Sequence, residues 1–383
     1  KLLDARAETG EPYIVNIDNC NDALPQGQKD LGLEVKQSNL CSEITLPTNN
    51  ERTAVCCLSS VNLEHFDEWS KEEKFIDDLV TMLDNVLEHF IENAVDLNSL
   101  GGYNANYERF KKHIKEGKEG FTKAAYSAYR ERSIGLGAMG FHSYLQNQNI
   151  SFEGIFSTGI NYKLFKFIKG AAVNASRRLA VLRGEAPDIS NSGLRNCHLL
   201  AVAPNASSSI ICGGTSPSIE PIRANVFTHK TLSGSYKVRN KNLEKLINKK
   251  VTDPKKRKKV WQDISDNRGS IQKLKLFTKE EKEVFKTADE INQIWVVEHA
   301  YKRQEFICQS QSVNLFFILP DSTQDQEQHN EYLQYVSDVH WYGANKLKSL
   351  YYFRSDAAKA AENVNVKVPR IKLDEVECIA CEG

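Results

Sequence analysis

Short segments rich in β-branched and aromatic residues alternate with long helical patterns along most of this chain. The segments that predict strands are 13–18, 42–47, 53–59, 198–204, 311–317 and 349–353. Apolar residues recur at helical spacing over about 75–91, 160–182, 278–303 and 327–348. This alternation is typical of an α/β fold in which strands pair mainly in parallel, as a sheet or a barrel, with helices outside.

Three local signals predict where the helices begin and end. Ser70 and Glu73 match a capping box ahead of the first helical pattern, and Thr278 and Glu281 match another at the start of the third. Gly184 is expected to end the second helix, because glycine readily adopts the left-handed conformation found after a helix C-terminus.

The composition is that of a globular protein without an electrostatic bias. Among 383 residues, 50 basic side chains balance 50 acidic ones, which gives no reason to expect a nucleic acid or an acidic membrane as partner. No apolar run approaches the length of a membrane span, and the N-terminal segment is not a signal peptide. We therefore expect a cytoplasmic protein that binds no membrane.

The cysteine content points to thiol chemistry. Nine cysteines are many for a reducing compartment, and their spacing is not that of a secreted disulfide framework. We expect some to be kept for chemistry and several to be ordinary buried residues. The chain opens at Lys1 inside an apparent helix, so we interpret it as a piece of something longer or as a split protein that needs a partner.

Residues 1–368 are expected to form the folded part of the chain. Within it, 235–262 is polar and highly basic and is interpreted as a surface insertion. Its lysine-rich run at 253–259 fits a solvated loop better than a nucleic-acid patch, given the zero net charge. Beyond about 368 the periodicity stops, which predicts a flexible acidic tail over 369–383.

The motif SNLCSEI places a thiol between an amide and a carboxylate. If the segment is extended, Asn39, Cys41 and Glu43 point to the same side. A neighbouring carboxylate disfavours thiolate formation, which argues against a protease-like nucleophile. A thiol that stays protonated can instead lose a hydrogen atom, while Glu43 transfers a proton of a substrate hydroxyl and Asn39 orients that hydroxyl. The alternative is a structural cysteine with two solvated neighbours.

Two adjacent cysteines follow in the next strand candidate. Neighbouring side chains of a strand face opposite ways, so only one of Cys56 and Cys57 can share a site with Cys41. Vicinal cysteines rarely bridge each other, so a redox partner for either must come from elsewhere in space. Two buried small apolar residues are the alternative.

The segment 203–221 follows a strand candidate and contains a serine-rich turn that opens a helix. Hydroxyls and free backbone N–H groups at such a turn can bind phosphate, and a capped helix without a ligand is the alternative. The glycine spacing is neither that of a Walker motif nor that of a Rossmann fingerprint.

Two paired motifs near the end of the chain suggest electron and thiol transfer. Tyr351 and Tyr352 are either a core and a surface tyrosine or a stacked pair that passes an electron and a proton inward. Cys378 and Cys381 form a C-x-x-C motif on the expected tail, which suits thiol–disulfide exchange better than a zinc site lacking further ligands there.

The combination and order of these motifs resemble the large (catalytic, α) subunit of class I ribonucleotide reductase. The resemblance is carried by SNLCSEI, AVCCLSSVNL, APNASSS with SIEP, RQEFICQSQSVNLF, LYYFR and the terminal C-x-x-C, and it runs from about Tyr13 to Gly383. The tyrosine pair favours class I, because a cobalamin-dependent class II enzyme does not need an internal radical pathway.

The resemblance implies roles for the residues of the first motif. Cys41 resembles the cysteine that becomes a thiyl radical and abstracts the 3′ hydrogen of the ribose. Glu43 resembles the base on the 3′ hydroxyl, and Asn39 resembles the amide that holds the substrate hydroxyls. Cys56, rather than Cys57, resembles one of the two thiols that reduce the 2′ position.

The resemblance also implies the surrounding machinery. Tyr351 and Tyr352 match the radical pathway from the small subunit, and Cys378 with Cys381 match the tail dithiol that re-reduces the active site. The residues at the expected grip on the substrate phosphates are Asn205, Ala206, Ser207, Ser208 and Ser209.

The partners implied are a radical-generating small (β) subunit, thioredoxin or glutaredoxin, and a ribonucleoside diphosphate substrate. No cofactor is expected in this chain, and the radical cofactor, expected to be of the di-iron tyrosyl type, belongs to the small subunit. The host cytoplasm is the expected location if a phage encodes the chain.

The resemblance covers only the second half of such a subunit. It implies half of a ten-stranded α/β barrel made of two half-barrels, with the radical cysteine on a finger loop inside. The N-terminal half would supply the second active-site thiol and the sites for ATP and deoxynucleotide effectors. A gene split in two, as in some large phages, and an artificial fragment both fit. The rival hypothesis is a non-catalytic remnant that serves as an interaction module. Cys57, Cys308 and the basic 235–262 stretch have no role assigned by the resemblance.

Overall fold

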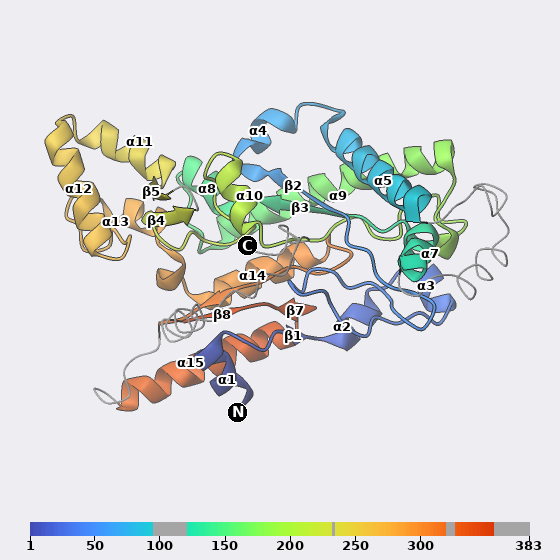
Figure 1. The fold of residues 1–383 in the computed structure, drawn as a ribbon. Coiled ribbons are helices and arrows are strands. Elements are labelled where there is room, and N and C mark those ends of the chain that lie inside the picture. Colours follow the sequence, from blue (N-terminus) through green and yellow to red (C-terminus); the bar gives the residue numbers. More distant parts are fainter. Residues whose placement is uncertain (95–120, 232–233, 319–325, 356–383) are drawn as a thin grey trace.

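The structure is a computed structural model that describes residues 1–94, 121–231, 234–318 and 326–355 (Figure 1). Its centre begins with two parallel strands, β2 (Leu58–Asn62) and β3 (Gly135–Met139). A parallel bridge between Leu136 and Leu200 adds the next extended segment. Two of these segments correspond to strand candidates of the sequence, although β2 begins five residues after the start of its predicted segment at 53, whereas β3 was not predicted as a strand.

Strands β2 and β3 and the segment around Leu200 form a row of parallel segments, and further segments extend this row beyond the one at Leu200. A bridge between Val202 and Gln311 adds a fourth segment, and β6 (Leu315–Phe316) pairs in parallel with β8 (Phe353–Arg354). The backbone N–H of Tyr351 donates to the carbonyl of Val313 at 2.8 Å and joins the last two segments further. Among the described residues this row is open and does not close into a barrel, as expected for half of a barrel.

Close backbone packing in the row depends on a glycine. A Cβ atom added at Gly137 in β3 would lie 2.5 Å from the carbonyl oxygen of Ala201, well inside contact distance. A residue without a side chain therefore lets the segment around 201 approach β3 closely enough to pair with it.

At the edge of the row, β7 (Ser349–Leu350) pairs antiparallel with β1 (Ile14–Val15). The N-terminal segment therefore lies beside the segment that leads into the tyrosine pair. The backbone N–H of Phe353 donates to the carbonyl of Gly10 at 3.0 Å and extends the contact.

Long helices cover the row. Helices α5 and α9 pack on each other near β2, while α14 contacts β6 and α15 contacts β7 (Figure 1). The helices of this layer are α5 (Phe75–Ala94), α7 (Phe121–Glu131), α9 (Ile155–Arg183), α14 (Gln293–Gln304) and α15 (Gln326–Ala344). The shorter α-helices are α1 (Leu2–Thr9), α2 (Ile17–Asp22), α3 (Gln26–Asp30), α4 (Phe66–Trp69), α8 (Phe141–Asn147) and α10 (Ala206–Ile211). Short 3-10 helices occur at Leu63–His65, Pro187–Ile189 and Ala288–Glu290.

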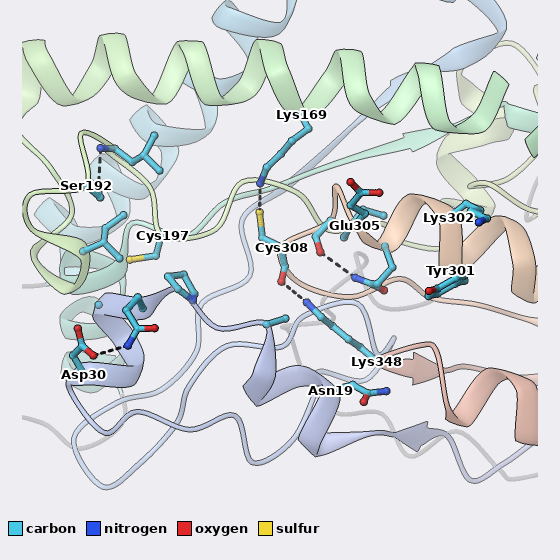
Figure 2. A pocket seen from close by; sticks show the side chains of 18 of the residues that line it. Asn19, Asp30, Lys169, Ser192, Cys197, Tyr301, Lys302, Glu305, Cys308 and Lys348 are labelled. Carbon is cyan, nitrogen blue, oxygen red and sulfur yellow. Dashed lines mark hydrogen bonds between the residues drawn. The ribbon is translucent and has the colours of Figure 1, made fainter. Parts of the chain in front are cut away.

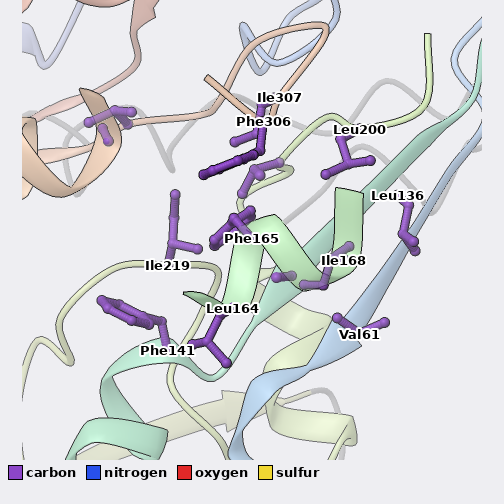
Figure 3. Close-up of a cluster of buried hydrophobic side chains, with 14 of the residues drawn as sticks. Val61, Leu136, Phe141, Leu164, Phe165, Ile168, Leu200, Ile219, Phe306 and Ile307 are labelled. Atoms are coloured by element: carbon purple, nitrogen blue, oxygen red, sulfur yellow. The ribbon is translucent and has the colours of Figure 1, made fainter. Parts of the chain in front are cut away.

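The main apolar core lies between these helices and the strands. Figure 3 shows side chains of α9, such as Phe165 and Ile168, in the same cluster as Val61 of β2 and Leu136 of β3. All four are at most 2% exposed. Burying such side chains contributes about 1.5 to 3 kcal/mol each, so this cluster is the main force that holds helices to strands.

Residues 226–285 form a lobe with a core of its own. The lobe contains β4 (Val226–Thr231), β5 (Gly234–Arg239), α11 (Lys241–Lys250), α12 (Pro254–Asp266) and α13 (Lys279–Val284). Leu243, Ile247, Trp261, Ile264 and Phe285 are buried together inside it. The basic stretch 235–262 is therefore part of a folded unit whose lysines lie outside and whose apolar residues lie inside.

Two of the predicted helix boundaries are confirmed and one is wrong. Gly184 follows α9 with φ of 85°, and Thr278 with Glu281 forms a complete capping box. Ser70 instead ends α4, and α5 begins only at Phe75. No membrane-crossing helix occurs in the described parts of the chain, because none is both long and apolar enough.

The continuous helix expected over 278–303 is also wrong. Helix α13 ends at Val284, and α14 begins at Gln293. A second capping box, at Thr287 and Glu290, starts a short 3-10 helix between them. These polar caps interrupt the apolar periodicity that suggested one helix.

A buried ion cluster ties the segments around the core together. Asp188 accepts hydrogen bonds from both terminal nitrogens of Arg52, and Arg130 Nε donates to it at 2.8 Å. The Asp188 side chain is 0% exposed and that of Arg52 is 5% exposed. Removing one member of such a buried set leaves an uncompensated charge.

We expect Asp188→Asn to lower the free energy of unfolding by about 3 kcal/mol or more, because Arg52 stays buried without its carboxylate. Asp77→Asn is the matched control, since it breaks a partly exposed pair with Arg178 and should cost about 1 kcal/mol or less. Urea denaturation of both variants measures the difference. Equal losses would contradict a stabilising role of the buried cluster.

Candidate active site

The segment 39–44 forms a closed turn. The backbone N–H of Ser42 donates to the carbonyl of Asn39 at 3.1 Å, and the N–H of Ile44 donates to Asn39 Oδ1 at 3.0 Å. Ser42 has a φ of 65°, in the left-handed region. The strand predicted for 42–47 and the extended alternation of Asn39, Cys41 and Glu43 are therefore wrong, because the loop closes on itself.

Serine side chains of the neighbouring segments hold this loop. Ser312 Oγ donates to the carbonyl oxygen of Cys41 and also lies 3.1 Å from Glu43 Oε2. Ser349 Oγ donates to the carbonyl oxygen of Ser42 at 2.9 Å. The loop therefore lies against the two segments, around 310–313 and 349–352, that form the end of the parallel row.

Glu43 is buried at the base of the loop, with 3% of its side chain exposed. Burial raises the pKa of its carboxyl above the ordinary value, while its own backbone N–H and the side chains of Asn39 and Ser312 oppose the shift through hydrogen bonds. A serine hydroxyl has one hydrogen, so Ser312 satisfies both Cys41 and Glu43 at once only when a protonated Glu43 donates. The site therefore accommodates Glu43 in both proton states.

Tyr351 connects the loop to an aromatic cluster. Its hydroxyl donates to Cys41 Sγ at 3.6 Å, within the range for hydrogen bonds to sulfur. Tyr351 is 5% exposed, and burial, together with the contact to Cys41, raises the pKa of its phenol. The phenol therefore stays protonated at neutral pH, with its hydrogen directed at the sulfur.

Tyr352 lies beside Tyr351, with ring centroids 4.5 Å apart and ring planes inclined by 60°. The two rings are in contact but tilted rather than stacked, and electron passage through them stays a prediction. Tyr13, which the motifs did not single out, packs on both rings, with centroids 4.6 and 4.9 Å away. Arg354 lies 3.9 Å over the ring of Tyr352, and Arg6 Nη2 donates to the carbonyl of Tyr351 at 2.9 Å.

The two vicinal cysteines differ sharply in their surroundings. Cys57 is buried, its thiol contacts the carbonyl of Leu83, and burial raises the pKa of that thiol to about 11. Cys56 is exposed. The structure therefore separates a packed thiol from an accessible one, and the accessible one is the cysteine chosen from the sequence.

The predicted phosphate-binding residues lie at the start of α10. Asn205 precedes the helix with φ of 53°, and its Oδ1 accepts a hydrogen bond from Ser60 of β2 instead of capping the helix. Ala206, Ser207 and Ser208 are exposed, whereas Ser209 is buried and donates to the carbonyl of Ala206. The Asn205 side chain does not cap α10, and phosphate binding at the helix start stays a prediction.

Other predicted features fall outside the site. Cys378, Cys381 and the tail 369–383 lie outside the described residues. Within the described ranges, no group of three or more His, Cys, Asp or Glu side chains is placed to hold a metal ion.

Sequence reasoning missed the serines that position the loop, Ser310, Ser312 and Ser349, and also Tyr13, which packs on the tyrosine pair. The backbone N–H of Ser310 donates to the carbonyl of Glu43 at 2.8 Å. The available signal was the alternation of serine and glutamine in QSQS, which is unusual for a segment buried beside a core. That pattern indicates polar side chains with partners inside the fold.

Comparison with known proteins gives consistent results. A family model described as "Ribonucleotide reductase, barrel domain" matches residues 1–192 and 185–353. The ribonucleoside-diphosphate reductase large subunit of Invertebrate iridescent virus 3 is 44% identical over 387 residues, covering 100% of this chain and 56% of the relative. A putative large subunit of Frog virus 3 is 40% identical, covering 100% of this chain and 62% of the relative.

A solved structure agrees with these relatives. The class Id ribonucleotide reductase alpha subunit of Actinobacillus ureae superposes with a TM-score of 0.75 at 37% identity, over 94% of this chain and 61% of that one. The chain thus spans little more than half the length of the relatives that it matches. Because the family model covers most of the sequence, the chain belongs to the ribonucleotide reductase barrel-domain family.

Proposed function

We propose that this chain is the radical-bearing half of a ribonucleoside-diphosphate reductase large subunit. The observation that carries the proposal is the contact between the Tyr351 hydroxyl and Cys41 Sγ at 3.6 Å, with buried Glu43 fixed to the same loop. A phenol and a thiol in contact can exchange a hydrogen atom, because their O–H and S–H bonds are close in strength. Names of relatives that mention ribonucleoside-diphosphate reductase support the same reaction.

The proposed sequence of steps uses the chain's own groups. Tyr352 and Tyr351 pass an oxidising equivalent from a separate radical-generating subunit, and Cys41 transfers its hydrogen atom to Tyr351. The resulting thiyl radical abstracts the 3′ hydrogen of the substrate ribose, and ionised Glu43 accepts the proton of the 3′ hydroxyl. Asn39 supports the carboxylate by a hydrogen bond.

Completion of the reaction needs groups beyond those in the described site. Cys56 and a second thiol from the N-terminal half of the subunit would supply two electrons and two protons, so that the 2′ hydroxyl leaves as water and a disulfide forms. Cys378 and Cys381 would then reduce that disulfide, with thioredoxin or glutaredoxin as the final source. The start of α10, from Asn205 to Ser209, would hold the diphosphate, with Ala206, Ser207 and Ser208 exposed there. The expected compartment is the cytoplasm, where these reductants act.

We expect Cys41→Ser and Tyr351→Phe each to abolish deoxyribonucleotide formation when the chain is combined with an N-terminal half and a small subunit. Serine has too strong an O–H bond to replace the thiol, and phenylalanine removes the hydroxyl that reaches Cys41. Cys212→Ser and Tyr144→Phe are matched controls, because Cys212 is exposed and the Tyr144 hydroxyl bonds to Asp67 elsewhere.

Product formation is measured by chromatography of the nucleotides. Activity that survives Cys41→Ser would overturn the radical assignment. If every reconstituted mixture is inactive, the rival hypothesis of a non-catalytic interaction module is favoured instead.

Glu43 must be ionised to act as a base, yet burial raises its pKa. If the folded-state pKa of Glu43 lies above the unfolded value of 4.5, the folded chain binds a proton at Glu43 more tightly than the unfolded chain does. Protonation of Glu43 therefore stabilises the fold fully below about pH 4.5, and this stabilisation is lost as pH rises through the folded-state pKa. Glutamine cannot ionise. We therefore expect the free energy of unfolding of Glu43→Gln, relative to the parent, to increase with pH by about 1.4 kcal/mol for each unit of the shift.

Urea denaturation at several pH values between 4 and 8 measures this difference, and subtraction cancels all other titrating groups. Glu72→Gln is the control, because it makes the same change at an exposed position. A flat difference for Glu43→Gln would show that the carboxyl has an ordinary pKa.

A further inference from the structure

Cys308 forms a close pair with a lysine of α9. Lys169 on α9 donates a hydrogen bond to Cys308 Sγ at 2.6 Å (Figure 2). Lys348 approaches the same residue from the other side, and its ammonium group donates to the carbonyl oxygens of Cys308 and Gln309 at 2.5 and 2.8 Å. Lys169 therefore contacts the thiol of Cys308, and Lys348 contacts its backbone carbonyl.

This environment distinguishes Cys308 from the other partly or fully buried cysteines. Burial raises the pKa of the Cys308 thiol, but the charge and hydrogen bond of Lys169, with backbone groups of Leu199 and Leu200, outweigh burial and lower the pKa below its ordinary value. Burial raises the pKa of the Cys20 thiol to about 11. A cysteine that ionises readily is a nucleophile, whereas the packed thiols are inert.

The pair opens on a large cavity. The cavity has a volume of about 1090 Å³, and Cys308 lies at its wall together with Lys169 and Lys348 (Figure 2). Its charged lining consists of Lys169, Lys302, Lys346 and Lys348 against Asp30 and Glu305. The excess of ammonium groups favours an anionic molecule, and the volume is at the upper end of small-molecule sites.

A second thiol in the same cavity provides a natural comparison. Cys197 also lines the wall, but burial raises the pKa of its thiol well above the ordinary value, and Glu131 and Asp188 add to this shift. Two thiols thus share one cavity, and only Cys308 is paired with a lysine by a hydrogen bond.

We propose that Cys308 is a modification site for anionic low-molecular-weight disulfides, of which oxidised glutathione is the probe. The Cys308 thiolate attacks one sulfur of the disulfide, so that the disulfide's S–S bond breaks as a new S–S bond to Cys308 forms. One equivalent of the small thiolate leaves, and no further oxidant is required. The lysines of the cavity bind the carboxylates of the incoming molecule. This chemistry is independent of ribonucleotide reduction.

The experiment treats the purified full chain with oxidised glutathione at pH 7 and follows each cysteine by peptide mass spectrometry. We expect mixed disulfide to form on Cys308 faster than on Cys197. The parallel reaction with cystamine, a cationic disulfide, provides the test of charge. The rate ratio of oxidised glutathione to cystamine should be higher at Cys308 than at exposed Cys212.

Lys169→Gln should slow the reaction of Cys308 with oxidised glutathione by about threefold for each unit by which the pKa of the Cys308 thiol rises. A higher pKa makes each thiolate more nucleophilic, but the fraction of Cys308 present as thiolate falls by more. Lys163→Gln is the matched control, because Lys163 is an exposed lysine on the same helix. Thermal unfolding verifies that both variants are folded.

Three results would overturn the proposal. The first is an equal rate of mixed-disulfide formation at Cys308 and Cys197. The second is a rate ratio of oxidised glutathione to cystamine that is no higher at Cys308 than at Cys212. The third is a folded Lys169→Gln variant whose Cys308 reacts as fast as that of Lys163→Gln. The first two need no variant, so the proposal can be tested even if Lys169→Gln does not fold.

Discussion

The loop that carries Cys41 depends on hydrogen bonds from the segment 310–312. Having closed into a turn, the loop forms no continuous strand ladder, and its orientation comes from Ser310 and Ser312 on one side and Ser349 on the other. The segment 310–312 is itself fixed by parallel pairing with Val202. The geometry of the candidate site thus depends on how the parallel segments pair. Those segments are in turn held in place by the apolar core under α9.

The same dependence explains which parts of the molecule the sequence could predict. Alternating strand and helix patterns predicted the α/β class, and Gly184 and the Thr278 capping box marked real helix boundaries, because these signals act over a few residues. Residue type and order also singled out Cys41 and Tyr351, which the structure brings into contact. Their contact was not predictable, since 310 positions separate them in the chain.

The wrong secondary-structure predictions share one physical cause. Side-chain hydrogen bonds to the backbone compete with the structure that the spacing of polar and apolar residues indicates. Alternation predicted an extended segment at Asn39, but the Asn39 amide bonds to the backbone of Ile44 and closes a turn. Apolar periodicity predicted one helix over 278–303, but a second cap at Thr287 divides it. Polar side chains that bond to the backbone are therefore the residues at which periodicity is least informative.

Cys41 and Cys308 have different nearest neighbours. Cys41 faces the neutral hydroxyl of Tyr351, with which we propose that it exchanges a hydrogen atom. Cys308 faces an ammonium group, which stabilises the thiolate and favours two-electron exchange with disulfides. Both lie next to the segment 309–312. One short segment therefore separates the two thiols for which we propose radical and nucleophilic chemistry, and the two differ in the charge of the nearest side chain.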